Sequence, residues 1–307
     1  MKMLNTFIAV AVLGSAASMA SAALLVADGF NYTAPAALSG KTDVNFTSNP
    51  ATWGLAGTAG QDPVVASGSL TYTGTGALPN LPGSSSAQVV VTGGAASRIP
   101  LGTPASAGTF TQAANAGTSL YYSFTMNVSD ISKLSTGVNG AFIAGFNNTA
   151  GTATPTADAG VLCIRTDSQT GTTYHLGVAQ QQATGRVFDA TDSYSVGDTL
   201  FVVVAYNFGA TAGTDTSDLY VFDGAAIPSS LPSTPTAHGA YTAEINTSVD
   251  NISSFFLRDN TGAATTLIDD VRIGTTWSDV ATVPEPASLS LLGLGALGML
   301  SRRRQQD

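Results

Sequence analysis

Apolar and polar residues alternate most clearly in the second half of the chain. Between residues 120 and 128, the side chains of Leu120, Tyr122, Phe124, Met126 and Val128 occupy every second position, which is typical of a strand with one buried face. Further short strands are expected at 141–146, 160–165, 173–179, 218–223, 253–258 and 266–273, separated by Gly, Asn, Thr and Asp. The stretch 199–206 is almost wholly apolar, and we expect it to lie in the middle of a sheet.

The first half carries fewer strands. They are expected at 24–30, 64–65, 69–73 and 87–92, whereas 98–118 reads as a loop. No stretch between residues 23 and 280 sustains a 3.6-residue period, and there is no fixed repeat of the kind that marks a propeller or solenoid. About a dozen short strands with Gly- and Asp-rich turns predict an all-β antiparallel sandwich.

The two ends of the chain have a different pattern. Residues 1–22 begin with Lys2, continue with an apolar stretch and end in an Ala-x-Ala site at Ala20 and Ala22. This order is that of a cleaved signal peptide. Residues 23–280 then form the predicted β-sandwich domain, and residues 281–307 form a separate tail.

The tail consists of three blocks. Val283, Pro284, Glu285 and Pro286 form a stiff, extended tetrapeptide, because each proline fixes its own φ and restricts the residue before it. Residues 287–300 carry no charge, and as a helix they would measure roughly 21 Å against a hydrocarbon core of about 30 Å. Arg302, Arg303 and Arg304 follow and would hold the C-terminus on the cytoplasmic side as a membrane stop. A buried C-terminal helix of the domain is the alternative.

This order of blocks resembles the PEP-CTERM sorting signal of Gram-negative bacteria, over Val283 to Arg304. The resemblance implies recognition by an exosortase-type transpeptidase, cleavage near Pro284–Pro286, and a transient inner-membrane anchor with a short transmembrane helix. It also implies release or transfer to the cell surface or extracellular matrix, commonly alongside exopolysaccharide.

The strand pattern carries a second resemblance. The stretches 194–206, 218–221 and 268–277, with the opening 28–32, are similar to the laminin-G/concanavalin-like jelly roll of many exported proteins. The expected fold is therefore an antiparallel β-sandwich of this type, with an N-terminal signal helix and a C-terminal apolar helix. The resemblance implies a ligand site on the concave sheet or among the rim loops, and no binding residue carries over by motif.

Charge limits the partners that we expect. The chain has a formal net charge of −9, and residues 23–280 hold seven basic and 18 acidic residues. A domain this acidic argues against nucleic acid and favours cations or neutral glycans. Cys163 is the single cysteine of the chain, and its apolar surroundings predict a small buried hydrophobe.

No catalytic constellation emerges from the sequence. A glycoside hydrolase needs two carboxylates across the scissile bond, but Glu244 is the only glutamate before the tail. Asp269 and Asp270 are neighbours on a predicted strand and should point to opposite faces. His175 and His238 are 63 residues apart, without the spacing of a metal site.

Two weak candidates for a ligand site remain. Asp189, Asp192 and Asp198 lie in one turn region and could bind calcium, as could acids around 215–223, although Asp is also an ordinary turn residue. Trp53, in a Gly-rich loop, could stack on a sugar, whereas Trp277 is expected to be a packing residue.

These observations favour an exported, non-catalytic surface or matrix protein that is sorted through its tail and contacts exopolysaccharide. Two alternatives stay open: a carbohydrate-active enzyme with an unrecognised Asp-based site, and a purely structural matrix protein without a ligand.

Overall fold

The protein is described as a computed structural model over residues 24–43, 51–57, 61–75, 81, 87–91, 95–103, 106–107, 110–150, 155–181, 184–211, 213–240, 251–258 and 264–281. The predicted signal peptide with Ala20 and Ala22 lies outside these residues. So do the predicted motif Val283–Pro286, the apolar helix after it and the arginine cluster Arg302–Arg304. Among the described helices, none is long and apolar enough to cross a membrane.

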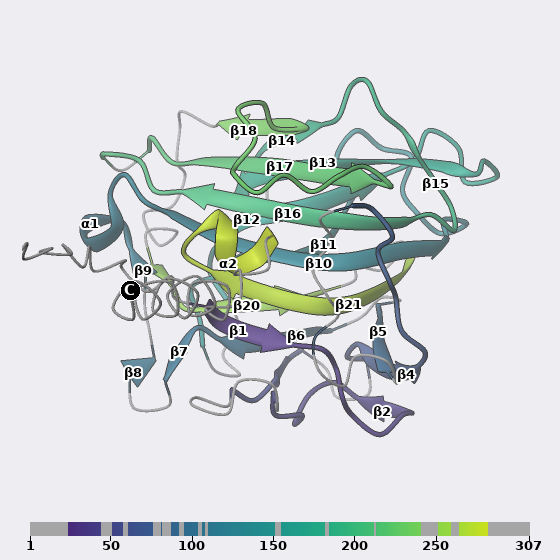
Figure 1. The fold of residues 1–307 in the computed structure, drawn as a ribbon, viewed down its shortest axis with the longest axis horizontal. Helices are drawn as coiled ribbons and strands as arrows, with labels where there is room; N and C mark the ends of the chain where they lie inside the picture. The colour runs from purple at the N-terminus through teal and green to yellow at the C-terminus, as the bar shows by residue number, and fades with distance from the viewer. Residues whose placement is uncertain are drawn as a thin grey trace, which may run out of the picture.

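The described strands form an antiparallel sandwich of two sheets, which confirms the predicted fold class (Figure 1). The nine-stranded sheet has the order β18-β17-β16-β10-β21-β5-β4-β2, with β1 also paired to β21. Its strands are β1 (Leu24–Asp28), β2 (Ala36–Ala37), β4 (Val64–Ser67), β5 (Ala87–Val91), β10 (Ser119–Asp130), β16 (Thr199–Asn207), β17 (Thr216–Asp223), β18 (Ala237–Ala240) and β21 (Thr265–Gly274).

The eight-stranded sheet has the order β14-β13-β12-β11-β20-β6-β3, with β15 paired to β13. Its strands are β3 (Gly54–Ala56), β6 (Ala96–Pro100), β11 (Ala141–Asn147), β12 (Asp158–Arg165), β13 (Thr173–Gln181), β14 (Thr184–Phe188), β15 (Tyr194–Ser195) and β20 (Ser254–Leu257). The remaining described elements are short: β7 (Gly102–Thr103), β8 (Ser106–Ala107), β9 (Phe110–Thr111), β19 (Asn251–Ile252), α1 (Gln112–Asn115) and α2 (Trp277–Ala281).

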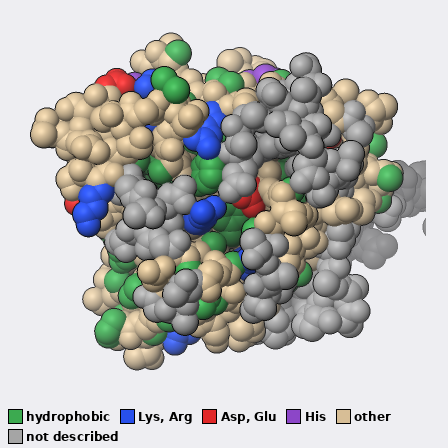
Figure 2. All heavy atoms as spheres, turned by 180° about the vertical axis from the view of Figure 1, so that it is seen from behind, with side chains coloured by type: hydrophobic (Ala, Val, Ile, Leu, Met, Phe, Trp, Pro, Cys, Tyr) green, Lys and Arg blue, Asp and Glu red, His purple; other side chains and the backbone are tan. Residues whose placement is uncertain are grey.

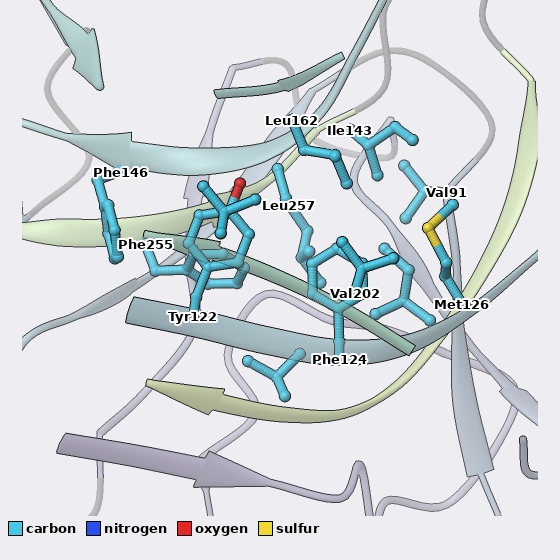
Figure 3. Packing of buried hydrophobic residues seen from close by; sticks show 14 of the residues in the cluster. Val91, Tyr122, Phe124, Met126, Ile143, Phe146, Leu162, Val202, Phe255 and Leu257 are labelled. Carbon is cyan, nitrogen blue, oxygen red and sulfur yellow. The ribbon is translucent and has the colours of Figure 1, made fainter. Parts of the chain in front are cut away.

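The main core lies between the two sheets (Figure 3). All five alternate residues of β10 that the sequence singled out, from Leu120 to Val128, are buried in it. The rings of Tyr122 and Phe255 come from opposite sheets and lie 5.0 Å apart between centroids. As expected, β16 is an interior strand, paired to β10 and β17.

The outer face of the nine-stranded sheet carries a second apolar layer. Tyr121, which alternates away from the main core, joins β16 and β17 side chains beneath α2. The indole Nε1 of Trp277 donates to the Pro228 carbonyl at 3.0 Å, and the Ser123 hydroxyl donates to the Val280 carbonyl at 2.6 Å. Trp277 is thus a packing residue, as predicted, and α2 closes this face directly before the tail.

Strand β21 changes its partner along its length. On one side it pairs with β10 throughout; on the other, residues 266–268 pair with β5 and residues 271–274 pair with β1. Between these two parts, Asp270 has φ +56, and one extra residue is accommodated opposite β10. This β-bulge lets both Ile268 and Val271 face the main core although they are three positions apart.

The bulge overturns the expectation that Asp269 and Asp270 point to opposite faces. Simple alternation fails here because the extra residue shifts the period. Both carboxylates instead hold the same segment: Asp269 accepts a hydrogen bond from the Leu70 amide at 2.9 Å, and Asp270 accepts one from the Leu81 amide at 2.8 Å. Burial, reinforced by the nearby charge of Asp270, raises the pKa of Asp269 to about 8.

The same contact corrects the expected strand at 69–73. These residues form an irregular segment with Leu70 and Tyr72 buried, because Asp269 takes the Leu70 amide that a neighbouring strand would otherwise bond. The stretch 98–118 is not a plain loop either. It includes most of β6, whose central residues are buried, and short elements after it.

Replacing Asp269 should change how stability depends on pH. Because its pKa is raised above that of the unfolded chain, folding takes up a proton, and stability falls as pH rises from about 4 to about 8, by at most about 1.4 kcal/mol per pH unit. Asp269→Asn cannot titrate, so its free energy of unfolding, measured in urea, should fall less steeply over that range. Asp192→Asn, at an exposed turn residue, is the control. Parallel pH profiles for wild type and Asp269→Asn would contradict this assignment.

Candidate functional site

The outer face of the eight-stranded sheet combines apolar and basic side chains. On β12, Leu162 and Ile164 belong to the main core, whereas Val161 and Cys163 alternate outward into a separate apolar cluster. Cys163 is fully buried there, and burial raises the pKa of its thiol to about 12. It is a buried hydrophobe, as the sequence predicted, and its thiol stays protonated at neutral pH.

Small residues on this face make room for three phenylalanine rings. Phe142 and Phe256 are buried in the outer cluster, and Phe188 packs against it. A Cβ at Gly145 would lie 3.0 Å from the Phe256 ring, and one at Gly177 would lie 2.7 Å from the Phe188 ring. Glycine at these two positions therefore allows the rings to lie against the sheet.

Arginines are concentrated on the same face. Of the seven basic residues between 23 and 280, all of which are described, four lie on it: Arg98 of β6, Arg165 of β12, Arg186 of β14 and Arg258 directly after β20. Arg98, Arg165 and Arg258 occupy outward positions, because a neighbour of each along the chain faces the main core. Arg186 is outward because its guanidinium group lies over Phe142 of the outer cluster. We call these four residues the arginine face.

Two of the guanidinium groups lie on aromatic rings. The Arg186 guanidinium carbon is 4.4 Å from the centroid of Phe142, and that of Arg165 is 5.1 Å from Phe188. Arg165 also pairs with the exposed carboxylate of Asp167 at 3.1 Å and keeps a quarter of its side chain exposed. The stacking fixes the planes of both groups and places positive charge above an apolar floor.

The other two arginines surround a buried acid. Arg98 is fully buried, donates to the Thr149 carbonyl at 3.3 Å, and has its pKa lowered by burial. Burial raises the pKa of Asp158 to about 6, although the charges of Arg258 and Arg98 oppose this shift. Figure 2 shows the side opposite to Figure 1, where apolar, basic and acidic side chains surround a hollow near its centre.

The charge of this region differs in sign from that of the chain. Against its four arginines, the interactions described above place two carboxylates, those of Asp158 and Asp167. A third acid, Asp259, directly follows Arg258 in the sequence, but it lies outside the described residues. The described groups thus have an excess of positive charge within a protein of net charge −9.

Trp53 is not an exposed sugar platform. It is fully buried, its indole Nε1 donates to Asp28 at 2.7 Å, and its ring lies 6.1 Å from that of Phe30. The Asp28 carboxylate also accepts hydrogen bonds from the Phe30 amide and the Tyr32 hydroxyl. The sequence suggested an exposed Trp53 because its hydrogen-bond partner, Asp28, lies 25 residues earlier in the chain and could not be foreseen.

The acids suggested for calcium act in turns. Asp189 is buried and accepts hydrogen bonds from the Thr191 and Asp192 amides and the Tyr194 hydroxyl; Asp198 accepts one from the Ser195 amide. Within the described part of the chain, no three His, Cys, Asp or Glu side chains are grouped to hold a metal. The ring of His175 lies between Asp167 and the Asp192 carbonyl, each at 3.1 Å.

The C-terminal segment has a family match. Residues 282–305 match the family model of the PEP-CTERM protein-sorting motif, which confirms the resemblance seen in the tail. The motif indicates an exported protein that is sorted to the cell surface by exosortase. No protein of curated function matches the sequence.

Several solved structures are similar to this chain over most of its length, at TM-scores below 0.5. Domain 4 of AbnA, a GH43 extracellular arabinanase from Geobacillus stearothermophilus solved with arabinotriose, is 14% identical with a TM-score of 0.39; the match covers 86% of this chain and 95% of that one. Lectin II from Ulex europaeus is 13% identical with a TM-score of 0.37, covering 83% and 100%. The globular domain of T. cruzi calreticulin is 10% identical with a TM-score of 0.40, covering 82% and 88%. The fold assignment itself rests on the strand pairing of this chain.

Gly145 offers a test of the aromatic floor. In Gly145→Ala the added methyl group would meet the Phe256 ring at 3.0 Å and the Val161 Cα at 3.2 Å, so we expect a loss of about 1–3 kcal/mol in the free energy of unfolding. Gly54→Ala is the matched control on the same sheet, because its Cβ would have its nearest neighbour at 4.0 Å; it should change stability by less than about 0.5 kcal/mol. Equal effects of the two substitutions in urea unfolding would contradict close ring packing.

Proposed function

We propose that this exported protein is a non-catalytic surface or matrix protein that contacts extracellular polysaccharide through the arginine face. The sorting motif supplies the cellular context, because a chain sorted to the cell surface meets extracellular glycans there. The fold supplies a broad sheet surface that can lie along a polymer.

One observation carries this proposal: guanidinium groups stacked on phenylalanine rings on the outer face of the eight-stranded sheet. Flat groups with fixed N–H donors suit the hydroxyl and acid oxygens of sugars. The opposite sheet offers no comparable surface in its described part, because α2 and the segment around Tyr72 cover its apolar outer layer.

A carbohydrate-active enzyme is the second candidate, and Asp158 is the observation in its favour. This acid lies beside the arginine face with a pKa raised to about 6, which suits a general acid. A glycosidase mechanism needs a second carboxylate. Asp269 and Asp270 do not offer one here, because they lie on β21 of the other sheet and accept hydrogen bonds from the Leu70 and Leu81 amides.

A combined binding and hydrolysis assay separates these functions. We expect the purified chain to bind one or more extracellular polysaccharides on a glycan array and to release no reducing ends from them. Asp158→Asn should leave that result unchanged. Release of reducing ends by wild type that Asp158→Asn abolishes would establish the enzyme instead. A folded chain with no array binding would support the purely structural alternative.

The sorting motif can be tested independently of any ligand. Replacing Pro284, Glu285 and Pro286 by alanine should leave the protein unprocessed in the inner membrane, because the stiff, extended segment presented to the transpeptidase is lost. Cell fractionation and mass spectrometry of the C-terminus measure this. As a control, alanine at Gln306 and Asp307, outside the matched residues, should be processed normally. Normal release of the triple variant would show that the motif is not the processing signal.

A further inference from the structure

We infer that the polysaccharide bound by the arginine face is acidic, a polymer of carboxylate-bearing sugars. This inference rests on the proposed function and specifies the ligand class of the same site. The chain as a whole favours neutral partners by its net charge of −9, so the local charge of this face is the feature that decides the ligand.

The distribution of charge is the first reason. Four of the seven basic residues between 23 and 280 lie on one face of one sheet, whereas the described acids close to them are Asp158 and Asp167. Such a positive region in an acidic protein attracts and orients an anionic ligand. A neutral glycan could accept hydrogen bonds here but would gain no attraction from the excess charge.

The width of the region indicates a polymer. From β14, which carries Arg186, to β20, which is followed by Arg258, the sheet order runs through four strand intervals, or about 19 Å at about 4.8 Å per interval. Arg165 lies on β12 between them, whereas Arg98 of β6 is fully buried and contributes its charge from below the surface. A single small anion cannot contact charges spread over this width, but successive acidic sugars of one chain can.

The chemistry of the four groups favours carboxylates. Guanidinium is planar, always charged, and matches a carboxylate with two parallel hydrogen bonds. Arg186 and Arg165 are held flat on Phe142 and Phe188, so less conformational entropy is lost when they bind. The remaining surface is acidic overall, which disfavours nucleic acid, because duplex DNA carries one negative charge per about 1.7 Å, several times the density of one carboxylate per sugar.

Two forms of one polymer test the inference. Polygalacturonate carries a carboxylate on every sugar, and its fully methyl-esterified form is neutral with the same backbone. We expect the full-length chain, measured by isothermal titration calorimetry, to bind polygalacturonate at least about tenfold more tightly than the ester. This preference should shrink as NaCl is raised from about 50 mM to about 300 mM, because salt screens exposed charges.

Substitutions place the binding on the sheet. Arg186→Gln combined with Arg258→Gln should weaken polygalacturonate binding by about tenfold or more, and Arg186→Lys should retain more affinity than Arg186→Gln. Lys133→Gln is the control: it removes one positive charge from a loop beside Asp130 of the nine-stranded sheet and should leave affinity unchanged. Because arginine variants can lose stability, the salt series on wild type tests the ligand class without them.

The outcomes distinguish failure of the acidic-ligand inference from failure of the proposed function on which it rests. Equal, salt-insensitive binding of the acid and the ester would overturn the acidic ligand and leave polysaccharide contact intact. Binding of DNA as tight as that of polygalacturonate would overturn the assignment to acidic sugars. Absence of binding to either polymer and to every glycan on an array would overturn the proposed function itself.

Discussion

Strand β21 is the element on which the sandwich depends. It joins β10 on one side to both β5 and β1 on the other, so the nine-stranded sheet is complete only when the last strand of the domain is in place. The bulge at Asp270 permits the change of partner while Ile268 and Val271 stay in one core. α2 ends at Ala281 and the sorting motif begins at residue 282. The residues that complete the fold therefore directly precede the sorting motif.

The two outer faces of the sandwich are covered in different ways. On the nine-stranded sheet, α2 and the segment held by Asp269 cover an aromatic layer with other apolar groups. On the eight-stranded sheet, guanidinium groups cover phenylalanine rings. The first arrangement closes a surface; the second leaves partly exposed cationic groups over apolar ones. This contrast is the reason for proposing a ligand site on the eight-stranded sheet.

Alternation of side chains was enough to predict the fold class and most long strands, as the buried face of β10 shows. It failed at Asp269 and Asp270, because a bulge shifts the period, and at Trp53, because the acid that binds its indole is 25 residues away. The arginine face was missed altogether. Its successive residues are separated by 21 to 72 positions in the sequence, and only strand pairing brings them onto one face. The net charge of −9 gives no sign of this local basic group.

The most direct test of this account is a map of arginine protection. The folded chain would be treated with phenylglyoxal, which modifies accessible arginines, with and without a bound acidic polysaccharide, and the modified peptides would be quantified by mass spectrometry. The account predicts that the ligand protects Arg165, Arg186 and Arg258, while buried Arg272 on β21 is unaffected. Unchanged modification of all three under saturating ligand would show that the polymer binds elsewhere.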